Sequence, residues 1–260
     1  MSDDLTYADY INVDELLGLQ RPRTPDVVTL TRTCEHFFIV THQTSELWLN
    51  QVLLDLDEAT TAVEQVRYLD AEECAQRCAT VLEVMASNLD VLATMPPGRF
   101  ASFRGELGHA SGAQSRQFRQ FDRRIGVGGR SPLLEALLAA CDREQVTLPG
   151  LLYPGHREHP DLAKIVLAML DLSRNAWRWK VMHLELVNRM IGVHTDGTGG
   201  SAGSDYLAGR LRMPFEPLWS AVSKMHEYVA TPGLGDDSTG SDSTARSAAD
   251  GCPHLATGTA

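Results

Sequence analysis

The chain has 260 residues, which is room for one large domain or two small ones around a full hydrophobic core. Its 23 Lys and Arg face 34 Asp and Glu, and the net charge of −11 argues against nucleic acid or an anionic membrane as a partner. The 43% share of hydrophobic residues is typical of a folded globular protein. Because no long apolar run and no signal-like leader is visible, we expect a soluble cytoplasmic protein.

The five cysteines are odd in number and contain no Cys-x-x-Cys pair, a pattern typical of free thiols in a reducing compartment. This spacing excludes a thiol redox motif, a zinc knuckle and the Cys-x-x-Cys-His attachment of covalent haem. It does not exclude haem that is bound without a covalent bond.

Helical periodicity prevails along the chain, and no stretch shows the strict alternation of a strand. After a polar opening broken by the prolines of Arg21–Pro25, the apolar spacing predicts a long helix from about 27 to 66. A second helix is predicted over 71–93 and ends before Met95-Pro96-Pro97-Gly98. The segment 100–112 has three closely spaced glycines, so we expect a loop or short turns there.

The second half is also predicted to be helical, apart from a Gly-, Pro- and His-rich connection at 148–160 that we expect to be exposed. The helices are expected at 114–125, 133–141, 160–191, 205–212 and 216–229. From Thr231 onward small and polar residues predominate without periodicity, which predicts a disordered acidic tail. The chain is therefore predicted to be an all-α helical bundle domain, 1–230, followed by a tail, 231–260.

His183 is the one polar side chain in an otherwise apolar stripe on the longest predicted helix. The stripe, at steps of three or four residues, consists of Met169, Leu172, Ala176, Trp179, His183, Leu186 and Met190. A lone histidine in such a stripe is more often a core residue that is hydrogen-bonded to a carbonyl. The alternative is an axial ligand to a flat apolar cofactor, because neutral imidazole in a hydrophobic wall can bind haem iron.

Three other residues are candidates for ligand contacts. His42 follows Phe38 by one turn on a half-apolar helix face, where it could contact a ligand or be structural. Arg104 lies among apolar residues, so its guanidinium must pair with an internal carboxylate, the commoner case, or with a ligand carboxylate. The glycine-rich loop at 197–203 lacks the ending of a P-loop, but its N–H groups and the Thr198 hydroxyl could hold a small anionic or zwitterionic ligand.

Four blocks of sequence, in order, resemble the haem-dependent tryptophan 2,3-dioxygenase superfamily. They are Tyr7-Ala-Asp-Tyr10-Ile11-Asn-Val-Asp14; Phe37-Phe38-Ile-Val-Thr-His42-Gln-Thr-Ser-Glu46-Leu-Trp48; Phe103-Arg104-Gly-Glu-Leu107-Gly-His-Ala-Ser111-Gly112-Ala-Gln114-Ser115; and Trp177-Arg-Trp179-Lys-Val-Met-His183 with Arg189-Met-Ile-Gly192 and the glycine-rich loop. One block would be modest support, but four in order favour the ligand-binding interpretations of the two histidines and the arginine.

The resemblance implies a role for each candidate. His183 is expected to be the proximal ligand of the iron of non-covalent haem b, with Trp179 supporting it one turn earlier. His42 is expected to accept a hydrogen bond from the indole N–H of the substrate. Arg104 is expected to bind the carboxylate of the amino acid, and Thr198 to help hold its carboxylate and ammonium groups.

The resemblance also implies the surroundings of the indole and the reaction. Apolar walls are expected from Phe38, Phe100 and Leu107, and a neighbouring subunit of a homotetramer is expected to contribute Tyr7, Tyr10 and Ile11. The implied reaction inserts O2 at the indole C2–C3 bond of L-tryptophan or a substituted tryptophan and gives N-formylkynurenine.

Two departures from the family keep alternatives open. The stretch between Arg104 and His183 is several tens of residues shorter than is usual, and Phe100 stands where some members have tyrosine. A wider pocket would suit a larger substrate such as β-methyltryptophan, and related monooxygenases of secondary metabolism leave a 2-oxindole. A haem-based O2 sensor without turnover is a third possibility, but it would have no need for a carboxylate-binding Arg104 with Thr198.

Overall fold

A computed structural model describes residues 5–153, 157–198 and 203–230, and all regular structure within these ranges is helical. The elements in chain order are α1 (Tyr7–Ile11), α2 (Val13–Leu17), α3 (Thr29–Glu64), α4 (Tyr68–Ala93), α5 (Pro97–Phe103), η1 (Arg104–Leu107), η2 (Gly112–Gln114), α6 (Arg116–Arg124), α7 (Pro132–Arg143), α8 (Leu148–Leu152), α9 (Pro160–Ile191), α10 (Gly203–Ala208) and α11 (Glu216–Ala230). The all-α prediction is confirmed.

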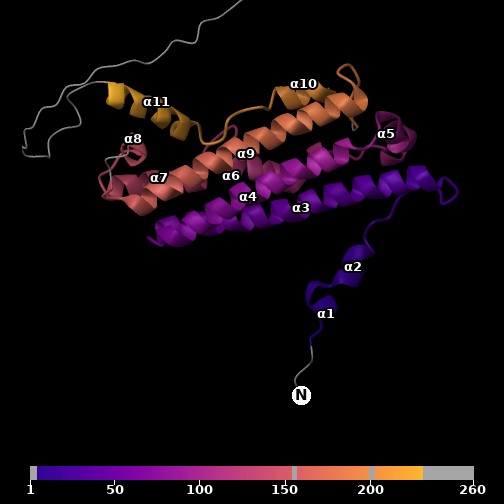
Figure 1. Cartoon of the computed structure of the whole chain (residues 1–260), viewed down its shortest axis with the longest axis horizontal. Helices are drawn as coiled ribbons and strands as arrows, with labels where there is room; N and C mark the ends of the chain where they lie inside the picture. The colour runs from indigo at the N-terminus through magenta and orange to yellow at the C-terminus, as the bar shows by residue number, and fades with distance from the viewer. Residues whose placement is uncertain (1–4, 154–156, 199–202, 231–260) are drawn as a thin grey trace, which may run out of the picture.

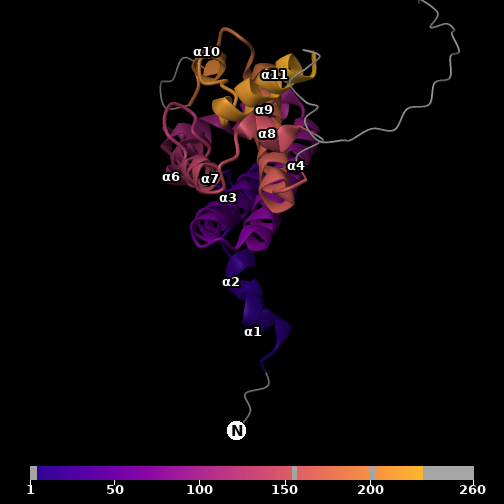
Figure 2. The same ribbon diagram turned by 90° about the vertical axis from the view of Figure 1, so that its left-hand side faces the viewer.

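Three long helices form the body, and α4 lies between α3 and α9 and packs against both (Figure 1). The buried face of α3 repeats at three- and four-residue steps through Leu49, Val52, Leu56, Ala59 and Val63. The helices α6 and α7 pack against α3 and lie on one side of the bundle (Figure 2). This arrangement fixes the relative positions of α3 and α9, which carry the two histidines singled out above.

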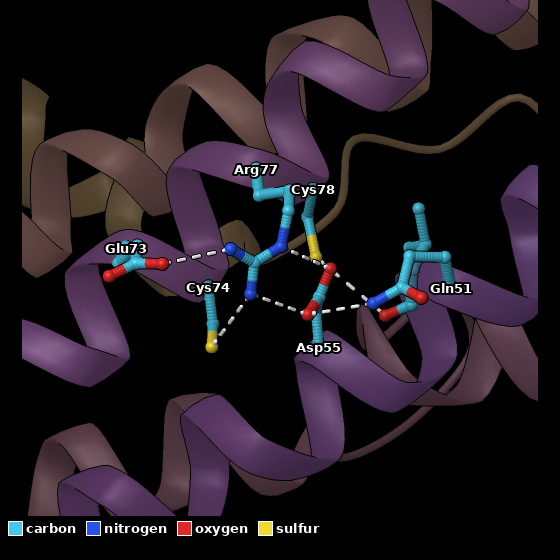
Figure 3. A network of polar contacts seen from close by, with 7 residues as sticks. Gln51, Asp55, Glu73, Cys74, Arg77 and Cys78 are labelled. Atoms are coloured by element: carbon cyan, nitrogen blue, oxygen red, sulfur yellow. Dashed lines mark hydrogen bonds and ion pairs between the residues drawn. The ribbon is translucent and has the colours of Figure 1, made fainter. Parts of the chain in front are cut away.

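An ion pair between a buried carboxylate and a partly exposed arginine joins α3 to α4 (Figure 3). Asp55 is 4% exposed and accepts two hydrogen bonds from Arg77, at 3.0 Å from Nε and 2.9 Å from Nη2, while Gln51 donates a third at 3.1 Å. Burial raises the pKa of the neighbouring thiols of Cys74 and Cys78, so both stay protonated. The cluster therefore fastens two helices together and offers no reactive thiolate.

Most of the predicted helices are found within a few residues of their expected ends, and three segments differ. Pro97 does not only end α4; it occupies the first turn of α5, so 97–103 is helical where a loop was expected from residue 100. Likewise α8 begins inside the connection predicted to be exposed, and Leu148 and Leu151 are buried. The opening before residue 21 contains α1 and α2, which are too short for a periodicity signal.

The predicted tail, 231–260, lies outside the described residues, so its disorder stays a prediction. The four described cysteines are all free, as expected. Among the described helices none is by itself long and apolar enough to cross a membrane; only the pair Tyr68–Ala93 and Pro97–Leu107, bent by 87°, satisfies length and composition.

The residues 5–20, here called the arm, lie off the bundle in both views (Figures 1 and 2). No residue of α1 or α2 is buried, and Tyr7 and Tyr10 are 77% and 73% exposed. Apolar and aromatic side chains this exposed are unusual unless another surface covers them. The arm is thus an extension with little support from the rest of the described chain.

Candidate functional site

An aromatic cluster marks the end of the bundle where α5 packs against α3 and α9. The ring centroid of Phe38 is 5.5 Å from that of Phe100 and 5.7 Å from that of Phe103, and the last two are 5.4 Å apart. Phe100 and Phe103 are buried, whereas Phe38 and Leu107 are half-buried against the core. These rings form an apolar wall, and the next turn of α3 carries His42.

His42 stacks on this wall with its ring centroid 4.0 Å from that of Phe38. Its Nδ1 lies 2.8 Å from the Phe38 carbonyl oxygen. A carbonyl can only accept, so Nδ1 donates and the neutral ring presents the free lone pair of Nε2. The side chain is exposed, but enough protein surrounds it for desolvation to lower its pKa, against the raising effects of the Phe38 carbonyl and Glu46.

His183 is half-buried on α9, and it has no hydrogen-bond partner among the described residues. Burial and, to a smaller extent, the nearby His42 lower its pKa to about 4, so the imidazole is neutral. The electrostatic effect of His42 on His183 shows that the two side chains, from α3 and α9, lie close enough to interact. The hydrogen bond from His183 to a carbonyl, which a core histidine would make, is not present among the described residues.

Trp179 lies one turn before His183 and is buried against α6, with ring centroids 5.6 Å from Phe118 and 6.3 Å from Phe121. Its indole Nε1 is buried without a hydrogen-bond partner within the described part of the chain. A buried donor without a partner costs free energy, so such atoms often mark a bound group. An imidazole and an indole N–H on one face of α9 thus both have unused bonding capacity.

Arg104 begins η1 and donates a hydrogen bond from Nη2 to the main-chain carbonyl of Asp196. No carboxylate pairs with Arg104 in the described ranges, so the internal ion pair that was the commoner expectation is not found. One neutral carbonyl leaves the positive charge and most of the guanidinium N–H groups available. The group can therefore accept a carboxylate ligand.

The same contact holds the loop that follows α9, and this loop includes Thr198. Gly203 closes the loop with φ +55°, and a Cβ there would lie 2.4 Å from the Thr195 carbonyl oxygen, so only glycine fits. Ser204 Oγ also donates to the Val193 carbonyl at 3.2 Å. Thr198 is half-buried and follows Asp196, the residue bonded to Arg104, by two positions. Residues 199–202 of the predicted ligand loop lie outside the described residues.

Two surface hollows elsewhere lack this chemistry. One of about 200 Å³ lies between α4 and α9 beside Asn175, and one of about 340 Å³ lies beside Pro132 on α7. Neither is lined by a histidine or an aromatic residue. No group of three or more His, Cys, Asp or Glu suited to a metal ion occurs within the described residues. The histidine pair therefore remains the strongest candidate site.

Comparison with known proteins agrees with the blocks that run through this site. A sequence model described as tryptophan 2,3-dioxygenase matches residues 1–133 and 140–225. The chain belongs to the tryptophan 2,3-dioxygenase family. Tryptophan 2,3-dioxygenase of Herpetosiphon aurantiacus is 31% identical over 261 residues, covering 85% of this chain and 98% of the relative. The proteins of the same name from Bordetella parapertussis and Caulobacter vibrioides are 31% and 30% identical, covering 83% and 86% of this chain and 89% and 100% of the relatives.

The comparison with the tryptophan 2,3-dioxygenase of Herpetosiphon also shows that this chain lacks a part of its relative. The alignment with the Herpetosiphon protein is 261 residues long but uses 85% of a 260-residue chain. Part of that relative therefore has no counterpart here, which agrees with the shortening noted from the sequence. The tryptophan 2,3-dioxygenase match also includes the arm, although Tyr7, Tyr10 and Ile11 do not lie at the site of their own subunit.

Two contributors to this dioxygenase-family site escaped the sequence analysis. Glu46 raises the pKa of His42 and is held by Gln117 of α6, whose Nε2 lies 2.7 Å from Oε2. Glu46 and Gln117 are 71 positions apart, so no local sequence pattern could indicate this contact. The Asp196 carbonyl that holds Arg104 is a main-chain group, so no residue type could have revealed it.

Proposed function

We propose that the protein is a haem-dependent tryptophan 2,3-dioxygenase of the cytoplasm. It inserts both atoms of O2 at the indole C2–C3 bond of L-tryptophan or a substituted tryptophan, which gives N-formylkynurenine. The observation that carries the proposal is one neutral, unpartnered imidazole on α9, close enough to a second imidazole on α3 for the two to interact electrostatically. Arg104, whose charge is not paired with a carboxylate among the described residues, lies on η1, which directly follows α5.

The residues present fit a haem. A neutral imidazole without a hydrogen bond in an apolar stripe is a suitable donor for haem iron, and His183 would hold the iron in this way. Trp179 would support it by packing one turn earlier on the same face, and its buried indole N–H, which has no other partner, is a donor available to the bound group. When bound without a covalent bond, ferrous haem b would supply the open iron position at which O2 is activated.

His42 orients the indole in this proposal. Its Nδ1 is committed to the Phe38 carbonyl, so Nε2 accepts the indole N–H and fixes the rotation of the ring. Because its pKa is lowered, the ring stays neutral at physiological pH and keeps this acceptor. Phe38, Phe100 and Leu107 pack on the indole and exclude water.

Arg104 holds the other end of the amino acid. The guanidinium binds the substrate carboxylate through two parallel hydrogen bonds, and Thr198 helps hold the carboxylate and the ammonium group. Fixing both ends of tryptophan sets the C2–C3 bond beside the O2 site, which contributes to the rate through orientation. The contact with Asp196 keeps the arginine and the loop together before substrate arrives.

The arm completes the site of a neighbouring subunit in this proposal. Tyr7, Tyr10 and Ile11 are exposed on their own subunit and would cover the substrate of the next one in a homotetramer. Covering the pocket would exclude water from the reaction.

Turnover of tryptophan under 18O2 tests the function. We expect a product with two labelled oxygen atoms, detected by mass spectrometry, together with the absorption of histidine-ligated haem. A product with one labelled oxygen would identify a 2-oxindole and contradict the dioxygenase assignment. Haem binding without any product would identify an O2 sensor instead. β-Methyltryptophan in a parallel reaction shows whether a larger substrate is preferred.

A further inference from the structure

One buried carboxylate holds the turn that connects the arm to α3. Glu35 is 3% exposed, and its Oε1 and Oε2 accept the main-chain N–H groups of Arg23 at 2.8 Å and Thr24 at 2.7 Å. Burial raises the pKa of Glu35, but these bonds and the charge of Arg32 outweigh it and hold the pKa below its ordinary value. Both oxygens of one side chain are thus spent on two consecutive peptide groups.

Arg32 holds the same turn from its outer side. Its Nη1 donates to the carbonyl of Pro22 at 3.2 Å and to that of Thr24 at 2.7 Å, and its Nε pairs with Asp26 at 2.8 Å. Glu35 and Arg32 lie one turn apart on α3, so the first turns of this helix bind the N–H and C=O groups of the turn together. The backbone at residues 22–24 is therefore fixed relative to α3.

The rest of the arm makes few contacts with the bundle that could fix its direction. Its described hydrogen bonds to the body both involve Gln43 of α3. The Gln20 amide donates to Gln43 Oε1 at 2.6 Å, and Gln43 Nε2 donates to the Leu19 carbonyl at 3.3 Å. Beyond that point α1 and α2 extend away from the bundle (Figure 2). A small change of backbone angles at the turn is amplified at the far end of such an extension.

We propose that Glu35 is a positioning residue for substrate binding, because it fixes the direction in which the arm leaves the bundle and so the point at which Tyr7 and Tyr10 meet a second copy of this chain. The inference rests on the proposed function, in which the arm covers the neighbouring substrate. Glu35 does not contact the substrate itself. Its effect is carried by the turn alone.

The variant Glu35→Gln tests this in the full-length haem protein. The amide has the same size but replaces one acceptor by a donor facing an N–H group, so one bond to the turn is lost. We expect the KM for tryptophan to rise at least tenfold, the kcat to change less than threefold and the haem spectrum to stay the same. Hydrogen exchange of the amides of residues 7–17 should become at least tenfold faster.

Asp26→Asn is the matched control, because it removes the charge of a side chain that is 87% exposed and leaves both bonds of Glu35 in place. Its KM and arm exchange should equal those of the wild type. If Glu35→Gln does not fold, Arg32→Gln loosens the same turn from the solvent side, and we expect changes in the same direction.

Three results would overturn the inference. Faster exchange of the arm with an unchanged KM would reduce Glu35 to a structural role, and unchanged exchange would show that it does not hold the arm. Equal effects in the Asp26→Asn control would assign the change to the exposed ion pair. Wild-type protein that turns over no tryptophan would refute the proposed function first, whatever the exchange data show.

Discussion

The guanidinium of Arg104 donates a hydrogen bond to the main-chain carbonyl of Asp196, which ties η1 to the loop after α9 across 92 positions of sequence. The bond satisfies one donor of a side chain that has five, and it neutralises none of the charge. The arginine is therefore oriented before a ligand arrives but is still able to bind a carboxylate. Such preorganisation lowers the cost of ordering the site on binding.

Arg104→Leu should weaken tryptophan binding by about 2–5 kcal/mol, the cost of leaving a desolvated carboxylate without its charged partner. Binding is measured by the shift of the haem absorption on titration with tryptophan. Tryptamine, which has no carboxylate, should bind wild type and variant alike. Arg99→Leu is the matched control, because Arg99 is an exposed arginine on the adjacent α5. Unchanged tryptophan affinity in Arg104→Leu would refute the carboxylate site.

The two histidines should separate haem binding from substrate orientation. His183→Ala should abolish the absorption band of histidine-ligated haem, because no other described imidazole lies on that face of α9. His42→Ala should retain the haem but lower the turnover of tryptophan by about 10²-fold, since misplaced substrate loses that much. The measurements are haem content per chain and initial rate. Haem retained in His183→Ala would contradict the axial assignment.

The haem-free protein should lose stability as the pH falls from about 6.5 to about 4. In this interval an unfolded chain protonates His183, whose ordinary pKa is 6.5, whereas the folded state with its pKa of about 4 does not. Stability therefore falls with falling pH and levels off below about 4, by a total of about 3 kcal/mol. His42 adds to the slope in the same direction.

His183→Phe checks this, because the variant keeps an apolar ring and has no proton to bind. Thermal midpoints of both haem-free proteins, measured across the interval, should fall more steeply toward acid pH in the wild type than in the variant. Parallel curves would show that His183 does not have the lowered pKa.

Asp55→Ala should destabilise the protein by about 2 kcal/mol and leave the reaction chemistry intact, because it deletes a buried carboxylate that accepts charged hydrogen bonds between α3 and α4. Glu73→Ala removes the exposed partner of the same arginine and should cost less than about 0.5 kcal/mol. Urea unfolding of the two variants makes the comparison. Equal losses would mean that burial does not govern this cluster.

The long helices were predictable because each repeats its apolar residues over many turns. Short elements lack that signal: α5 starts at a proline that the same rules treat as a stop, and α8 has only two buried leucines to mark it. The arm helices were missed for the same reason. Helix ends and short turns depend on contacts made elsewhere in the chain, so a local pattern does not contain them.

The site was predictable in part. The sequence identifies the face on which His183 lies, but a pattern cannot tell whether a carbonyl or a ligand lies opposite, and the two interpretations differed only in that respect. Likewise the sequence required a partner for Arg104 without identifying it, and a main-chain oxygen has no residue type to detect. The roles of Trp179 and Thr198 came from the resemblance, and they stay predictions.

The helix α9 runs without a break from Pro160 to Ile191, and along it Ser173 accepts the indole N–H of Trp219 at 2.9 Å, well before the turn that carries His183. Each residue of an α-helix rotates the next by about 100°. Deleting one residue between Ser173 and His183 would leave the helix intact and its Ser173 contact in place. The deletion would nevertheless rotate the imidazole by more than a quarter of a turn away from α3. In this stretch, then, the number of residues determines the direction of the His183 side chain, whichever residues make up the helix.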